Sequence, residues 1–166
     1  IHPTSRWLFK CWRDEAVAKV IDALQEGGLA RVILTSGRER RELEKIQSIQ
    51  RQSQTKAIDL SGKMTLKQLA ALSQRADLFI GVDTAPMHIA AAVKTPVIAL
   101  FGPSGEFNWG PWGDAGHVVI KKDWPCRPCG KDGCEGSKRS RCLEEIREEE
   151  VLAHAFRILE SGPRKE

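Results

Sequence analysis

The chain has 166 residues, of which 41% are hydrophobic and 29% are charged, a composition that excludes a disordered or collagen-like protein. Its net charge of +4 suits an anionic ligand but does not demand nucleic acid. No apolar run approaches the roughly 20 residues of a membrane-spanning helix, and the first residues lack the apolar stretch of a secretion signal. We therefore expect one globular domain over residues 1–166.

The predicted elements alternate between strands and helices. Apolar residues three and four apart predict helices over 13–25, 38–50, 65–75, 85–93 and 143–159. Short apolar runs bounded by turn residues predict strands over 30–34, 57–60, 77–82, 97–101 and 118–120, with a loop over 104–113. This order predicts an α/β fold with a doubly wound parallel sheet. Such sheets bind ligands beyond the carboxyl ends of their strands, so the residues after each strand are the candidates.

The strongest local signal follows a strand predicted in the middle of the sheet. Asp83 ends that strand, Thr84 is placed to cap the next helix, and Pro86 suits its first turn. The small Ala85 lets a ligand approach the backbone, and His88 lies in the same turn. A helix start of this kind favours an anion such as phosphate. The alternative is an ordinary capped helix with a structural histidine.

Further candidates follow other strands. Thr4 and Ser5 offer hydroxyl donors, and Lys10 supplies a flexible cation just before the first helix, although a solvated loop with aromatic anchors is equally compatible. Glu39, after the second strand, can bind ribose hydroxyls or simply favour a helix start. Met64 can face an adenine ring or fill the core.

Four of the five cysteines lie in a loop at about 123–142. The spacing of Cys126 and Cys129, followed by Cys134 and Cys142, is compatible with a structural zinc ion held by four thiolates. The second pair is too widely spaced for a standard zinc ribbon, so disulfides or free thiols stay open. We expect a structural staple for this loop, with thiols or zinc favoured over disulfides in a reducing compartment.

The chain resembles glycosyltransferase family 9, the lipopolysaccharide core heptosyltransferases. The segments that carry the resemblance are DLSGKMTL (59–66), ADLFIGVDTAPMHIAAA (76–92) and FGPS (101–104). The stretch PTSRWLFKCW (3–12) and the Cys-rich loop are most similar to the heptosyltransferase III branch, which adds a side-branch heptose to the inner core. The resemblance implies a GT-B enzyme of two Rossmann-like domains. This chain would be the C-terminal, donor-binding domain, without the N-terminal acceptor domain.

The resemblance also implies a role for each candidate residue. Lys10, with Thr4 and Ser5, would bind the diphosphate; Glu39 would hold the ribose; Met64 would contact adenine; Asp83, Thr84, Ala85 and His88 would bind the diphosphate and sugar. Ala85 stands where relatives often carry glycine. The catalytic base would lie in the missing domain, so no catalytic residue is expected here.

The implied reaction transfers heptose from ADP-heptose to the inner core of lipopolysaccharide, with inversion and no required cofactor. The acceptor would bind through the missing domain. The implied location is the cytoplasmic face of a Gram-negative inner membrane, in peripheral contact with its anionic leaflet.

Two other function classes compete with this one. A GT-B relative or a sugar-nucleotide epimerase would use a different nucleotide sugar. A nucleic-acid-binding module could be built on the Cys cluster and the basic loop 131–141, but Trp124 is its only aromatic support. We therefore expect no nucleic-acid partner.

Overall fold

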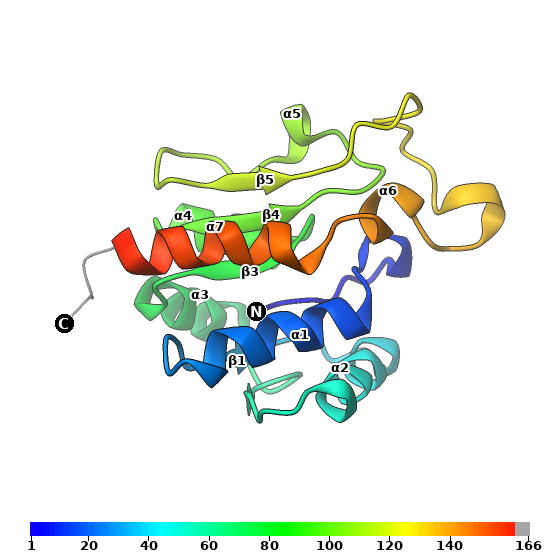
Figure 1. The fold of residues 1–166 in the computed structure, drawn as a ribbon. Helices are drawn as coiled ribbons and strands as arrows, with labels where there is room; N and C mark the ends of the chain where they lie inside the picture. The colour runs from blue at the N-terminus through cyan, green and yellow to red at the C-terminus, as the bar shows by residue number, and fades with distance from the viewer. Residues whose placement is uncertain (162–166) are drawn as a thin grey trace.

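The computed structural model describes residues 1–161 and shows parallel strands between layers of helices (Figure 1). The strands are β1 (Ile33–Leu34), β2 (Ile58–Asp59), β3 (Phe79–Val82), β4 (Val97–Leu100) and β5 (Val118–Ile120). The helices are α1 (Asp14–Glu26), α2 (Arg40–Gln52), α3 (Leu66–Arg75), α4 (Ala85–Ala92), α5 (Glu106–Trp109), α6 (Arg141–Glu144) and α7 (Glu148–Ser161). Short 3₁₀ turns occur at Leu8–Lys10 and Cys134–Gly136.

The first residues of the chain connect two groups of parallel strands. β1 pairs with β2, while β4 pairs with β3 on one side and β5 on the other. Between these groups, His2 N donates to Ile80 O at 2.9 Å and Thr35 N donates to Ile1 O at 3.0 Å. The order across the sheet is therefore β2, β1, residues 1–2, β3, β4, β5, which confirms the predicted parallel α/β architecture.

Helices cover both faces of the sheet, as the apolar strands predict. In Figure 1, α1 and α7 lie in front of the strands, and α3 and α4 lie behind them. Alternate residues of β3 and β4 enter different cores. One core, with α1 and α7, takes Ile80, Val82, Ile98 and Leu100. The other, with α4, takes Phe79, Val97, Ala99 and, just past β4, Phe101.

The first strand is shorter than predicted. The apolar run 30–34 forms a strand only at Ile33–Leu34. Upstream, Ala30 N donates to Leu24 O at 3.0 Å, and Val32 N donates to the side-chain oxygen of Gln25 at 3.1 Å. These bonds to the end of α1 take the N–H groups that a longer strand would use.

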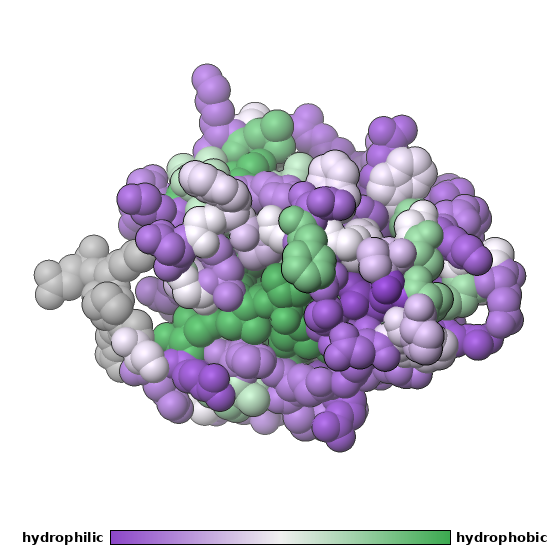
Figure 2. All heavy atoms as spheres, turned by 90° about the horizontal axis from the view of Figure 1, so that it is seen from above, coloured by the Kyte–Doolittle hydropathy of each residue, from purple (hydrophilic) through white to green (hydrophobic). Residues whose placement is uncertain are grey.

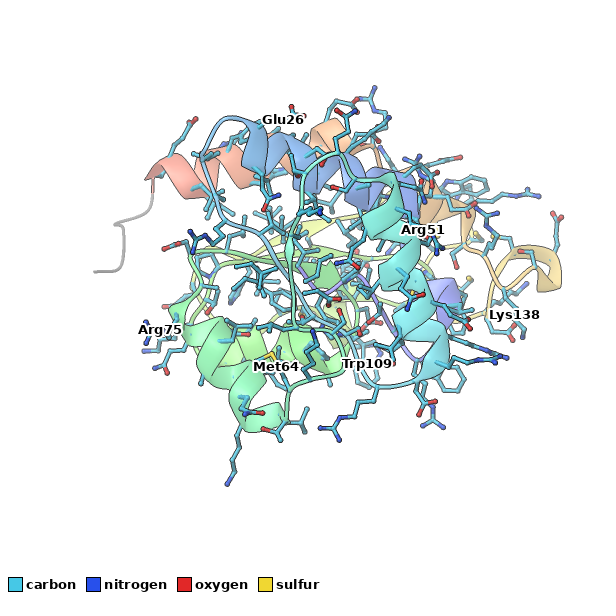
Figure 3. All side chains as sticks on the ribbon, turned by 90° about the horizontal axis from the view of Figure 1, so that it is seen from below. Glu26, Arg51, Met64, Arg75, Trp109 and Lys138 are labelled. Atoms are coloured by element: carbon cyan, nitrogen blue, oxygen red, sulfur yellow. The ribbon has the colours of Figure 1, made fainter. Side chains whose placement is uncertain are left out.

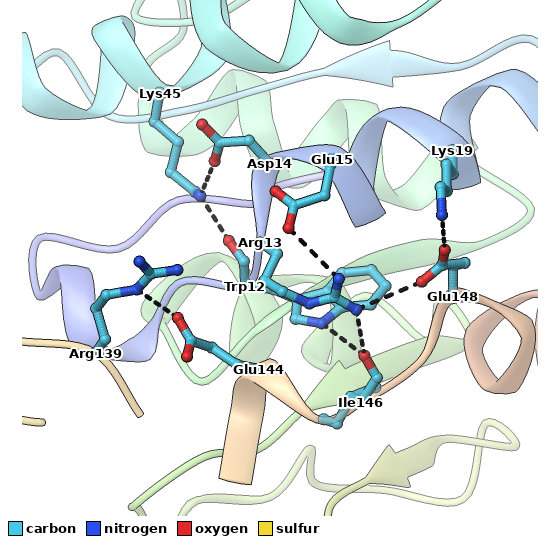
Figure 4. Close-up of polar contacts among 10 residues, drawn as sticks. All are labelled: Trp12, Arg13, Asp14, Glu15, Lys19, Lys45, Arg139, Glu144, Ile146 and Glu148. Atoms are coloured by element: carbon cyan, nitrogen blue, oxygen red, sulfur yellow. Dashed lines mark hydrogen bonds and ion pairs between the residues drawn. The ribbon is translucent and has the colours of Figure 1, made fainter. Parts of the chain in front are cut away.

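The prediction of one continuous helix over 143–159 is wrong. It is divided into α6 and α7, and Ile146 lies between them. Figure 4 shows the reason: the Ile146 carbonyl accepts hydrogen bonds from Trp12 Nε1 and from the Arg13 guanidinium, each at 3.1 Å. A carbonyl used in this way is not free for a helical bond, so the chain bends there.

The helix starts also test the sequence prediction. Thr65 and Gln68 form the reciprocal capping box of α3, as the cap at Thr65 predicts. Thr84 precedes α4 as predicted, but its hydroxyl donates to Val82 O at 3.4 Å instead of capping the helix. The predicted loop 104–113 contains α5, a single turn that the sequence analysis missed.

Candidate functional site

A cavity of about 560 Å³ opens at the carboxyl ends of the strands. Its walls come from the loop after residues 1–2, the loops after β1 and β2, the starts of α3 and α4, and the end of α5. These segments are far apart in sequence and meet only because parallel strands end at the same edge. The cavity therefore lies where the fold class predicts a ligand site.

An ion pair crosses the middle of the cavity wall. Lys10 Nζ lies 2.6 Å from Asp83 Oδ2, and the two side chains are 24% and 7% exposed. Lys10 closes the 3₁₀ turn before α1, whereas Asp83 follows β3. The pair holds an ammonium group beside the start of α4. A phosphate placed there would meet a positive charge that is already positioned.

A buried polar network supports the same wall. Thr4 Oγ1 donates to Glu42 Oε2 at 2.6 Å, and Gly37 N donates to the same oxygen at 3.0 Å. Glycine is needed at position 37, because a Cβ there would lie 2.5 Å from Glu42 Oε1. The network thus fixes the backbone on both sides of the carboxylate.

His2 extends this network toward the core of the sheet. Its Nδ1 lies 2.9 Å from Thr35 Oγ1, and its Nε2 lies 3.4 Å from Thr4 Oγ1. Burial lowers the pKa of His2 to about 3. His2 is therefore neutral at pH 7 and positions Thr4 without adding charge to the site.

The N-terminus of α4 forms the next part of the wall. Thr84, Ala85, Pro86 and His88 all line the cavity. The first turn of an α-helix presents backbone N–H groups and the positive end of the helix dipole, although Pro86 removes one donor. Together with Lys10 and its partner Asp83, this helix end provides a polar region of the cavity that offers hydrogen-bond donors to an anion.

The remaining wall is more apolar. Met64 and Leu66, from the β2–α3 segment, line the cavity together with Trp109 from α5. Figure 3 labels Met64 and Trp109 in a view from below. The site therefore combines groups that bind anions with surfaces that can contact a ring. This combination suits a nucleotide with a further group attached.

The family comparison agrees with this geometry. Residues 1–139 match the family model described as "Glycosyltransferase family 9 (heptosyltransferase)". The chain belongs to glycosyltransferase family 9.

Similar proteins place the chain within the family. It is 51% identical over 113 residues to lipopolysaccharide heptosyltransferase 3 of Escherichia coli K12, covering 68% of this chain and 33% of that protein. It is 30% identical over 132 residues to lipooligosaccharide heptosyltransferase 2 of Campylobacter jejuni, covering 79% of this chain and 41% of that protein. The chain thus spans between a third and two fifths of the length of these curated relatives.

Solved structures show the same fold. The family 9 glycosyltransferase of Veillonella parvula superposes with a TM-score of 0.79 at 31% identity, over 97% of this chain and 45% of that one. The E. coli heptosyltransferase WaaC, solved with ADP, superposes with a TM-score of 0.74 at 20% identity, over 94% of this chain and 42% of that one. The architecture is therefore that of one part of a family 9 glycosyltransferase with the GT-B fold.

The structure brings together eight of the nine predicted donor-site residues. Thr4, Ser5, Lys10, Met64, Asp83, Thr84, Ala85 and His88 all line the cavity. The structure places the ninth, Glu39, beside this cavity, so its predicted role stays a prediction. Glu39 is the exposed N-cap of α2 and lines a neighbouring cavity. The buried carboxylate of this family 9 site is Glu42, one helical turn later.

Other cavity residues were not predicted as site residues, among them His2, Thr35 and Trp109. The sequence could have predicted that Glu42 points inward. It lies four and seven residues before Ile46 and Ile49, on the same buried face of α2. Trp109 carried no comparable signal, because its helix was not predicted.

The Cys-rich loop does not form the predicted staple. All four of its cysteines are free thiols, and within residues 1–161 no group of three or more His, Cys, Asp or Glu residues could hold a metal ion. Cys142 is buried whereas Cys126 is exposed, and burial raises the pKa of the Cys142 thiol. Among the described residues these thiols do not gather into a group that could hold zinc, so the geometry does not fit the metal.

Arg127 secures this loop instead. Its Nε donates to Gly102 O at 2.5 Å, and its terminal nitrogens bond Lys122 O and Ser104 O at 3.3 Å. The guanidinium also pairs with Glu106. These contacts join the Cys-rich loop to the ends of β4 and β5 and to α5.

Proposed function

We propose that this chain is the donor-binding part of a heptosyltransferase that transfers heptose from ADP-heptose to the inner core of lipopolysaccharide. The carrying observation is the cavity wall in which Lys10, Asp83 and the start of α4 meet. Family membership supports the reaction class. The relatives solved or curated as heptosyltransferases support the substrate class.

Each part of the cavity has a place in this proposal. The N–H groups of α4 and the Lys10 ammonium bind the diphosphate, while Met64 contacts adenine. A carboxylate at the start of α2 holds the ribose: Glu42 lines the cavity between Gly37 and Thr4, and Glu39 lies beside it at the exposed N-cap. Ser5, Asp83 and His88 complete the polar lining.

The proposed chemistry is a single inverting displacement. A hydroxyl oxygen of the acceptor attacks the anomeric carbon of heptose as the bond from that carbon to the phosphate oxygen breaks. The hydroxyl proton passes to a base in the acceptor-binding part of the protein, which lies outside this chain. Negative charge develops on the departing ADP, where Lys10 and the α4 N-terminus stabilise it. We propose that these groups suffice without a metal cofactor.

Binding measurements test the assignment. Calorimetry should show weak binding of ADP and ADP-heptose by this chain, with UDP and GDP binding at least several-fold more weakly. No transfer to a heptose-bearing acceptor is expected from this chain alone. Preference for UDP would point to a different nucleotide sugar, and turnover by the isolated chain would overturn the division of roles.

The proposed location is the cytoplasmic face of the inner membrane. Among residues 1–161, no helix is long and apolar enough to cross a bilayer. The net charge of +4 supports peripheral contact with anionic lipid. Co-sedimentation with anionic but not zwitterionic vesicles would test this contact, and equal retention on both would contradict it.

The basic loop 131–141 gives little support to a nucleic-acid module. Lys138, Arg139 and Arg141 each pair with a nearby carboxylate, on Asp132, Glu144 and Glu135 respectively. Cations neutralised in this way leave a weak field for a phosphate backbone. We propose that nucleic acid is not a partner; tight duplex binding with a steep salt dependence would reverse that conclusion.

A further inference from the structure

The order of the strands fixes the order of the loops along the cavity. From one edge, the loops follow β2, β1, residues 1–2, β3 and β4. Met64 belongs to the first of these loops, and Lys10 and Asp83 belong to the middle ones. Trp109 belongs to the last loop. A nucleotide sugar with its diphosphate at the middle and its base near Met64 therefore has its sugar toward Trp109.

Trp109 is available to such a sugar. Its side chain is 57% exposed, and it is the one member of α5 that lines the cavity. Phe107, on the same helix, is 96% exposed, and Trp112 is 85% exposed; neither lines the cavity. Figure 2 looks down on the α5 side, where apolar side chains stand at the surface among hydrophilic ones. The loop thus offers one aromatic ring to the cavity and others to solvent.

Two ion pairs hold α5 in place. The Glu106 carboxylate is 2.8 Å from Lys121 Nζ and 3.2 Å from the Arg127 guanidinium. The Lys121 hydrogen bond, assisted by the charge of Arg127, lowers the pKa of Glu106, so the clamp stays charged at pH 7. Arg127 is almost fully buried. Because Gly110 N closes the turn onto Glu106 O at 2.8 Å, this clamp also fixes the backbone beside Trp109.

We propose that Trp109 is the platform on which an apolar face of the transferred sugar lies, and that the Glu106–Arg127 pair positions it. This inference rests on the proposed function and goes beyond it by assigning a residue to sugar recognition. An indole ring presents a large rigid apolar surface with few torsions to order, which suits a ring that carries C–H groups on one face. Trp109 would then help this site to distinguish ADP-heptose from ADP.

Calorimetry with two probes, ADP and ADP-heptose, tests the assignment. Trp109→Ala should weaken ADP-heptose binding about 2- to 10-fold, the range expected for one aromatic contact. ADP binding should change less than about twofold, and Trp109→Phe should restore most of the loss. The matched controls Phe107→Ala and Trp112→Ala should bind both probes as the wild type does.

A positioning variant tests the clamp. Glu106→Gln should lower ADP-heptose affinity in the same direction but by less, again with ADP unchanged. An equal loss for both probes in Trp109→Ala would assign the ring to the nucleotide and overturn the proposal, as would no loss for either. If the wild type bound neither probe, the donor-site function itself would fail; a wild type that binds both, with an unchanged Trp109→Ala, would overturn only this inference.

Discussion

The two sides of the cavity are held by different kinds of contact. On the side of residues 1–10, His2, Thr4 and Glu42 form a network in which all three side chains are buried. On the side of the Cys-rich loop, pairs such as Lys138–Asp132 and Arg141–Glu135 lie in solvent, and Arg127 is the charged side chain of that loop that is deeply buried. The groups that we propose to meet a diphosphate are thus held by buried contacts, whereas the Cys-rich loop is held mainly by exposed pairs and one buried arginine.

The largest expected effect is that acid destabilises the fold through the buried His2 network. His2 is neutral in the folded chain, with a pKa of about 3, whereas an unfolded histidine has its usual pKa near 6.5. Between these values the unfolded chain binds the additional proton, so stability is full above pH 6.5 and falls as the pH drops toward 3. The loss attributable to His2 is at most about 5 kcal/mol.

Denaturant unfolding of the wild type and of His2→Gln from pH 7.5 to pH 4 measures the contribution of His2 to the free energy of unfolding. The variant should be less stable at pH 7.5 and should lose less stability on acidification. Parallel pH profiles for the two proteins would show that His2 does not carry the effect.

Lys10→Ala addresses the charged centre of the cavity. Removal of a charge-assisted contact should weaken ADP binding by about 1–3 kcal/mol, or roughly 5- to 150-fold by calorimetry. Lys63→Ala is a matched control, because the exposed Lys63 ammonium bonds Asp59 O and does not line the cavity. Unchanged affinity in Lys10→Ala would make Lys10 only the partner of Asp83.

In the Cys-rich loop, Asp132→Asn should have a much smaller effect, in this case on stability. In the Lys138–Asp132 pair, the lysine side chain is 63% exposed and the aspartate side chain is 59% exposed. Exposed pairs of this kind contribute less than about 0.5 kcal/mol to stability, and salt weakens them further. A shift in urea midpoint larger than that of Lys10→Ala would mean that the loop is more tightly coupled to the fold than its contacts indicate.

Chelation should have the smallest effect of all. Because no metal-binding group exists within residues 1–161, EDTA should leave the melting temperature unchanged. All five cysteines should react under denaturing, non-reducing conditions, and elemental analysis should find no stoichiometric zinc. One zinc per chain, or two thiols lost to a disulfide, would restore the staple that the cysteine spacing predicts.

Sequence patterns identified most of this arrangement because the responsible forces are local. Apolar spacing predicted α1 and α3, and the strand-end rule selected Lys10 and Asp83, which the structure places in the cavity wall. The features that the sequence analysis missed depend on contacts between residues far apart in the sequence. Glu39 and Glu42 differ by one helical turn, and only the position of Thr4, 38 residues away from Glu42, shows which carboxylate is turned inward. The break at Ile146 likewise depends on Trp12 and Arg13.

That break has a consequence for how the chain is made. The indole N–H of Trp12 finds its acceptor 134 residues later, at Ile146 O. On a ribosome, Trp12 therefore emerges well before Ile146, the residue whose carbonyl accepts its indole N–H in the folded chain. The segment around Ile146 thus holds the segment just before α1 in place. Closure of this part of the fold is set by translation time as well as by folding rate.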